Sequence, residues 1–79
     1  MQDTTDTAKS DALRKMQEVR EYFEATGTKA YAAVMCHIDP SLKEDRQSIY
    51  DAYIRARIRE RDYPVIEKMY NAVQRLKAA

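Results

Sequence analysis

The chain has 79 residues, which is room for one small domain, and its thirteen Leu, Ile, Val and Phe residues predict a thin hydrophobic core. Fourteen basic residues against thirteen acidic ones leave a net charge of +1, which lacks the strong imbalance of disordered chains. One Gly, two Pro and one Cys exclude a turn-rich β fold, a glycine-rich phosphate loop, an internal disulfide and a cysteine-built zinc finger.

The first residues are polar and acidic, and they show no apolar periodicity. We therefore expect a disordered tail over residues 1–8, followed by a single helical domain over residues 9–79. The start lacks the basic and apolar pattern of a signal peptide, and the longest uncharged stretch, residues 30–38, is too short to cross a bilayer. We expect a soluble, cytoplasmic protein without a membrane partner.

A first helix is predicted over about residues 10–26. Apolar residues recur every three or four positions from Ala12 to Phe23, which is the period of one helix face. Asp11 suits the positive end of the helix dipole. Gly27 is the only Gly, and its position just past the pattern indicates a left-handed residue that ends this helix.

A second, short helix is predicted over residues 28–38, with Thr28 as its cap. Tyr31, Val34 and Ile38 lie on one stripe, and alanines fill the other sides. A short helix that is apolar nearly all round is typical of a central, buried element.

A third helix is predicted over residues 41–61, because Pro40 ends the previous helix and suits the first turn of the next one. Its cap is either Asp39 or Ser41, the latter opening a capping box. Pro64 predicts a break before a fourth helix over residues 64–78. The alternative is one long kinked helix over residues 41–78. The sequence therefore predicts an all-α fold, a compact bundle of about four helices.

No combination of residues indicates catalysis, a metal site or a bound cofactor. His37 is the only His, and it lacks the nucleophile, carboxylate or further ligands that an active site or a zinc site needs. Cys36 lies in the most apolar stretch, where a free thiol behaves as a small buried hydrophobe. We expect a protein that is not an enzyme.

The arginine-rich run from Arg55 to Arg61 is the most informative feature. Residues 1–54 carry a net charge of −3, whereas residues 55–79 carry +4. One interpretation is a solvated helix end, in which Asp51, Glu60 and Asp62 pair with the arginines.

The other interpretation is a binding surface. On a continuous third helix, Arg46 and Arg57 would project from the same arc as Tyr50 and Tyr53, and Tyr with Arg is the composition of interaction hot spots. The predicted partner-binding residues are Arg46, Tyr50, Tyr53, Arg55, Arg57, Arg59 and Arg61.

We expect a non-catalytic regulatory or inhibitory protein that binds a larger protein partner. By analogy with other small single-domain proteins, it is of the kind that phages or mobile elements direct against host machinery. The thin core also favours a homodimer, with helix 3 or helix 4 contributing Tyr and apolar surface.

The alternative is a small helical DNA- or RNA-associated regulator that uses the Arg-rich end of the third helix. A helix–turn–helix reading is disfavoured, because the segment Leu42–Asp45 would place two carboxylates where phosphate contacts belong.

Overall fold

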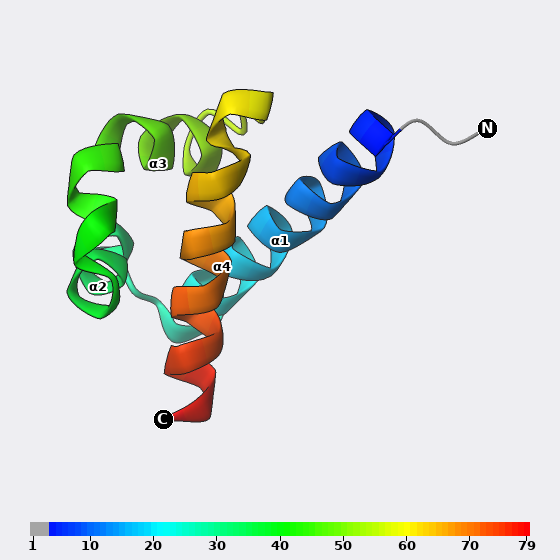
Figure 1. The fold of residues 1–79 in the computed structure, drawn as a ribbon. Helices are drawn as coiled ribbons and strands as arrows, with labels where there is room; N and C mark the ends of the chain where they lie inside the picture. The colour runs from blue at the N-terminus through cyan, green and yellow to red at the C-terminus, as the bar shows by residue number, and fades with distance from the viewer. Residues whose placement is uncertain (1–3) are drawn as a thin grey trace.

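The computed structural model describes residues 4–79 and folds them into four α-helices with no strand among these residues (Figure 1). The predicted all-α fold with four helices is confirmed. In chain order the elements are α1 (Thr4–Thr26), α2 (Tyr31–Ile38), the 3₁₀ helix η1 (Pro40–Asp45), α3 (Arg46–Tyr53), the 3₁₀ helix η2 (Glu60–Asp62) and α4 (Tyr63–Ala78).

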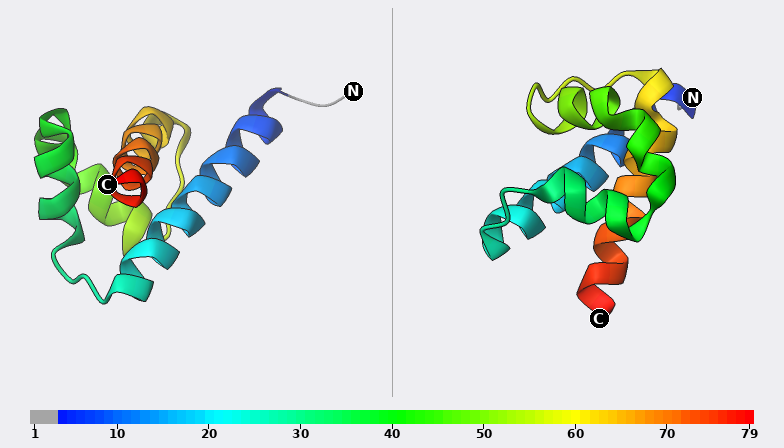
Figure 2. Two further views of the ribbon diagram at one scale, coloured as in Figure 1. Left: turned by 90° about the horizontal axis from the view of Figure 1, so that it is seen from below. Right: turned by 90° about the vertical axis from the view of Figure 1, so that its left-hand side faces the viewer.

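Helix α4 is the central element, because it packs against each of the other three α-helices and both 3₁₀ helices. Seen from below, α4 lies between α1 and the side formed by α2 and η1 (Figure 2). The N-terminal end of α1 reaches away from the rest of the domain, which makes the molecule 40 Å long and only 20–24 Å across (Figure 1). None of the described helices is long and apolar enough to cross a membrane.

The apolar stripes of the helices meet in one core. Every α-helix and η1 contribute side chains that are almost fully buried. These residues are Ala12, Met16, Val19, Phe23, Met35, Cys36, Leu42, Ile49, Ala52, Val65, Ile66, Met69, Ala72 and Val73.

Gly27 ends α1 as predicted. Its φ of 68° is the left-handed conformation that Gly adopts without steric cost. The amide of Thr28 donates to the carbonyl of Phe23 at 3.0 Å, and the amide of Gly27 donates to the carbonyl of Glu24 at 3.2 Å. Together these two bonds form a Schellman motif, which satisfies carbonyls that the helix end would otherwise leave free.

The two helices of the N-terminal half begin elsewhere than predicted. Helix α1 already begins at Thr4, and Ala8 lies beside Tyr63 and Ile66 of α4. Of the expected tail, residues 1–3 lie outside the described residues. Helix α2 begins only at Tyr31, and the predicted cap at Thr28 is wrong, because the hydroxyl of Thr28 pairs with that of Thr26 at 2.8 Å and no side chain caps the helix.

The predicted helix over residues 41–61 is wrong in extent. Residues 40–45 form the 3₁₀ turn η1, and α3 covers only Arg46–Tyr53. Asp39 is the cap, because its Oδ1 accepts from the amide of Ser41 at 3.1 Å and from the hydroxyl of Ser41 at 2.6 Å. The hydrogen bond from the Ser41 side chain holds the pKa of Asp39 below its ordinary value.

After Tyr53 the chain leaves the helix, and residues 54–59 are irregular. Ala56 has a φ of 52°, so the backbone turns back, and the amide of Arg57 donates to the carbonyl of Asp51 at 2.9 Å. Helix α4 then begins at Tyr63 with Pro64 in its first turn. The predicted break before Pro64 is confirmed, and the alternative of one kinked helix over residues 41–78 is wrong.

Candidate functional site

A cluster of one arginine and two buried carboxylates holds the irregular segment after α3. The Nη2 of Arg59 donates to Asp51 at 2.6 Å, and its Nε donates to Asp62 at 2.9 Å. Both carboxylates are almost fully buried, with 4% of Asp51 and 1% of Asp62 exposed. One guanidinium therefore ties the end of α3 to the start of α4.

Asp51 remains a carboxylate despite its position. Burial alone would raise its pKa, but hydrogen bonds from Gln47 and Arg59 and the charges of Arg59 and Arg55 hold the pKa below its ordinary value. No buried side-chain oxygen or nitrogen of the described residues lacks a hydrogen-bond partner. The buried oxygens of this cluster are thus all hydrogen-bonded.

The outer arginines of the run are bound more loosely to the same carboxylates. Arg55 lies 3.8 Å from Asp51, and Arg61 lies 3.7 Å from Asp62. The pairing predicted for Asp51 and Asp62 is therefore confirmed. Glu60 forms no ion pair within the described part of the chain.

An aromatic cluster lies where the end of α1 meets α2 and α3. The rings of Tyr31 and Tyr53 stack with their centroids 3.8 Å apart and an interplanar angle of 11°. Phe23 lies beneath them, at 6.2 Å from Tyr31 and 6.5 Å from Tyr53, and Tyr22 meets Phe23 edge-on. Burial raises the pKa of both Tyr31 and Tyr53. Tyr53, one of the predicted binding residues, is thus half-buried and packs within this aromatic cluster.

The outer face of α3 carries a stripe of exposed side chains. Arg46, Tyr50 and Ile54 follow one another at intervals of four residues, which places them on one side of the helix. Tyr50 is 50% exposed and Ile54 is 53% exposed. The one other large apolar side chain this exposed among the described residues is Leu13, on α1.

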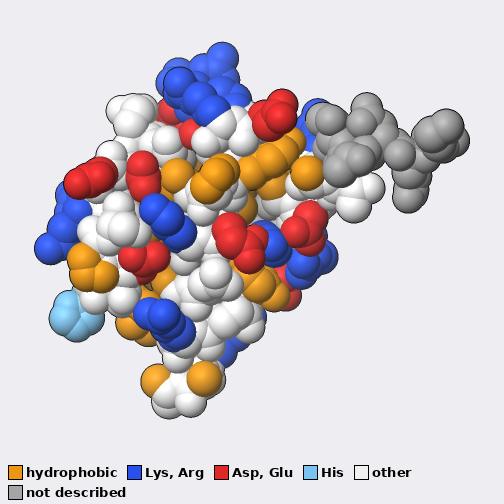
Figure 3. All heavy atoms as spheres, viewed as in Figure 1, with side chains coloured by type: hydrophobic (Ala, Val, Ile, Leu, Met, Phe, Trp, Pro, Cys, Tyr) orange, Lys and Arg blue, Asp and Glu red, His pale blue; other side chains and the backbone are white. Residues whose placement is uncertain are grey.

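Arg57 follows this stripe along the chain, but it does not lie on the continuous helix that the sequence predicted. The predicted arc of Arg46 and Arg57 needs a continuous helix, and α3 ends at Tyr53. Arg57 instead belongs to the turn around Ala56, which forms a shallow hollow with Arg55. Figure 3 shows Lys and Arg side chains gathered over this end of the molecule. We call Arg46, Tyr50, Ile54, Arg55 and Arg57 the α3 face.

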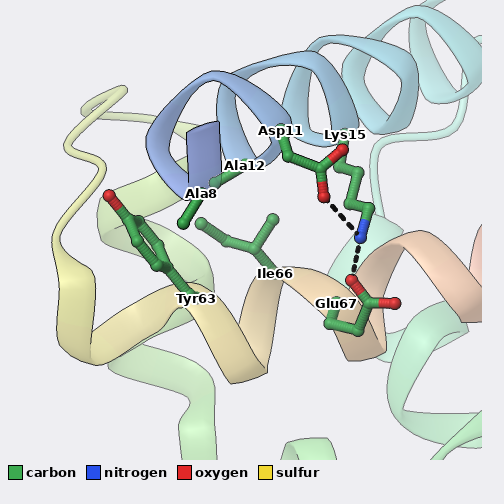
Figure 4. A pocket seen from close by; sticks show the side chains of 7 residues that line it. All are labelled: Ala8, Asp11, Ala12, Lys15, Tyr63, Ile66 and Glu67. Atoms are coloured by element: carbon green, nitrogen blue, oxygen red, sulfur yellow. Dashed lines mark hydrogen bonds and ion pairs between the residues drawn. The ribbon is translucent and has the colours of Figure 1, made fainter. Parts of the chain in front are cut away.

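A second hollow, which the sequence does not reveal, lies between the N-terminal halves of α1 and α4 (Figure 4). Ala8, Ala12, Tyr63 and Ile66 form its apolar side, and the ion pairs of Lys15 with Asp11 and Glu67 close the other. Hydrogen bonds from Arg14 and Lys15 hold the pKa of Asp11 below its ordinary value. Lys15 and Glu67 lie 52 residues apart in the chain, so no local sequence pattern predicts this contact.

Cys36 and His37, the only Cys and the only His of the chain, lie in different environments. Cys36 is buried with 2% exposed, whereas its neighbour His37 points to solvent. Among residues 7–79, whose side chains the structure describes, no three His, Cys, Asp or Glu side chains come together as metal ligands would. The chain matches no protein-family model, no curated protein and no solved structure.

Proposed function

We propose that this chain is a non-catalytic regulatory or inhibitory protein that acts by occupying a surface on a larger protein. The observation that carries the proposal is the exposed pair formed by Tyr50 on α3 and Ile54 at the C-cap of α3, with arginines before and after it in the chain. A soluble domain with a thin core gains stability by burying such side chains, and these two remain on the surface. Tyr and Arg beside an apolar side chain are the composition of binding hot spots.

The segments next to the α3 face are held by specific contacts, which favours binding. Tyr53 stacks on Tyr31 behind the exposed stripe, and Arg59 fixes the segment that follows it. A surface that is already ordered loses little conformational entropy when a partner binds.

Nucleic-acid binding is the weaker candidate. The segment from residue 51 to residue 62 carries four arginines but also Asp51, Glu60 and Asp62. The guanidinium of Arg59 already binds two carboxylates. The four arginines are therefore not equally available to bind phosphate groups. An origin on a phage or mobile element and a cytoplasmic location belong to the proposal by analogy of size alone.

A photo-crosslinking amino acid at position 50 tests the proposal. We expect Tyr50→p-benzoylphenylalanine to crosslink one protein in a nuclease-treated host lysate. The matched control carries the same group at Leu13, which is similarly exposed but lies on α1. Capture at both positions alike, or loss of the product on nuclease treatment, would refute the proposal.

A further inference from the structure

Two of the eight arginines differ from the other six in having no partner for the side chain. Arg46 and Arg57 form no side-chain hydrogen bond, ion pair or ring contact with residues 7–79, whose side chains the structure describes, and both are exposed. The six engaged arginines bind carboxylates or backbone carbonyls, and they are Arg14, Arg20, Arg55, Arg59, Arg61 and Arg75.

These two arginines flank the exposed apolar pair. Arg46 opens α3, and Tyr50 and Ile54 follow one and two turns later, so the stripe from Arg46 to Ile54 is about 12 Å long. Arg57 lies three residues beyond Ile54, in the turn held by the bond of its amide to Asp51. Along the chain, the exposed apolar pair thus has an exposed, unpaired arginine before it and another after it.

We propose that the partner presents an acidic amphipathic segment, in which an apolar pair is flanked by carboxylates. The apolar pair would pack on Tyr50 and Ile54, and the carboxylates would bind the guanidinium groups of Arg46 and Arg57. A guanidinium binds a carboxylate through two parallel hydrogen bonds, which gives the contact a direction as well as a charge. This inference rests on the proposed function and names the chemistry of its partner.

A second copy of the chain fits this surface less well. A symmetric contact of two α3 faces in antiparallel orientation would bring Arg46 of one copy towards Arg57 of the other. Like charges facing each other across an interface are unfavourable, and the α3 face itself has no carboxylate to offset them.

The test uses three synthetic 14-residue peptides, titrated into the ¹⁵N-labelled full chain and followed by the amide shifts. The first peptide has two Leu four residues apart with Glu at both ends. The second has Lys in place of each Glu, and the third has Ala in place of each Leu. We expect the first peptide alone to shift the amides of residues 46–57.

Charge-reversed variants localise the contact. Arg46→Glu and Arg57→Glu should each weaken binding of the first peptide about tenfold, which corresponds to about 1.4 kcal/mol. The control is Arg75→Glu, which changes the net charge equally on an exposed part of α4, where the guanidinium has only a 3.5 Å contact to a carbonyl. It should leave the affinity unchanged.

Several results would overturn the inference. These are equal binding of the lysine peptide, an equal effect of Arg75→Glu, tighter binding of a single-stranded oligonucleotide to the same amides, or a symmetric dimer in light scattering that Tyr50→Ala dissolves. The proposed function is tested separately, by the crosslink at position 50. If position 50 crosslinks a protein through a basic or uncharged segment, the function stands and the acidic partner is wrong.

Discussion

The guanidinium of Arg20, on α1, donates a hydrogen bond of 2.7 Å to the carbonyl oxygen of Ala52 in the last turn of α3. The same side chain donates to the carbonyl of Tyr53 at 3.1 Å, and it lies over the ring of Tyr53. In a longer helix those carbonyls would accept from amides four residues later. Arg20 takes the place of these amides and so stabilises the early end of α3.

Arg20→Met should therefore lower the free energy of unfolding by about 1–2 kcal/mol, because two half-buried carbonyls lose charged donors. Chemical denaturation measures the loss, and hydrogen exchange should speed up most around residues 52–57. The control is Arg46→Met, because the exposed side chain of Arg46 has no partner among residues 7–79, and this substitution should change stability by about 0.5 kcal/mol or less. Equal effects of both substitutions would contradict the role of Arg20.

The extent of α3 shows why local sequence patterns predict some helix ends and not others. Gly27 and Pro64 act through their own backbone, so the break at each is visible in the sequence. The end of α3 at Tyr53 depends on Arg20, which lies 33 residues earlier and has no local mark. The residues that follow Tyr53 have side chains that favour a helix, and the contact of Arg20 with the end of α3 overrides that preference.

Acid should destabilise the domain through Asp51. Its pKa in the folded state is lowered, so at pH values below about 4 the unfolded state binds more protons than the folded state. The free energy of unfolding should then fall as the pH drops through that range, while the contribution of Asp51 is fully present above it. Asp51→Asn should reduce this pH dependence, as thermal melts between pH 2 and pH 6 would measure.

The same substitution should also lower the stability at neutral pH, since Asn offers Arg59 a neutral acceptor in place of a buried carboxylate. The pH dependence will not vanish altogether, because the pKa values of Asp11 and Asp39 are lowered as well. An unchanged slope in Asp51→Asn would mean that this carboxylate does not contribute as the structure implies.

Substitutions at the two residues with positive φ, Gly27 and Ala56, should change the stability of the domain in opposite directions. Gly27→Ala should cost about 1 kcal/mol, and the cost is purely conformational, because an added Cβ would meet no atom within 4 Å. Ala56→Gly should gain up to about 1 kcal/mol, since Gly removes the strain of a left-handed residue at some entropic expense. Thermal melts would show shifts of about 5 °C in opposite directions. Shifts of the same sign would refute this account.

Cys36 should be a packing residue without redox function. With 2% of the residue exposed, the thiol should react with a disulfide reagent only as fast as the domain opens. Cys36→Ala should cost about 1 kcal/mol and leave partner binding intact. Binding that depends on oxidant in the native chain but not in Cys36→Ala would overturn this assignment.

The predicted binding residues were chosen by type and spacing, and the structure divides them. Tyr50 and Arg46 are exposed on α3, whereas Tyr53 is covered by its stack with Tyr31. Arg59 is bound by two buried carboxylates. Spacing on a helix identifies a face, but it does not show which arginine the fold brings to an aspartate, because that pairing depends on the turn between the helices.

Substitutions along the arginine run should therefore have unequal effects. Arg57→Lys should already weaken partner binding, because an ammonium cannot reproduce two parallel hydrogen bonds, and Arg57→Glu should weaken it further, by about tenfold in all. Both variants should keep the helicity and melting temperature of the native chain, since the side chain of Arg57 has no partner among residues 7–79. Circular dichroism and a binding assay on the crosslinked partner measure the two properties separately.

Arg59→Glu should behave differently, because it places a third carboxylate against Asp51 and Asp62. The melting temperature should fall, and binding should weaken through disorder of the segment that carries Arg57. Arg55→Glu and Arg61→Glu should have smaller effects on stability, since their ion pairs are long and exposed. If all four substitutions reduced binding alike, with a steep dependence on salt, phosphate contacts would explain the run better, and the nucleic-acid alternative would replace the protein partner.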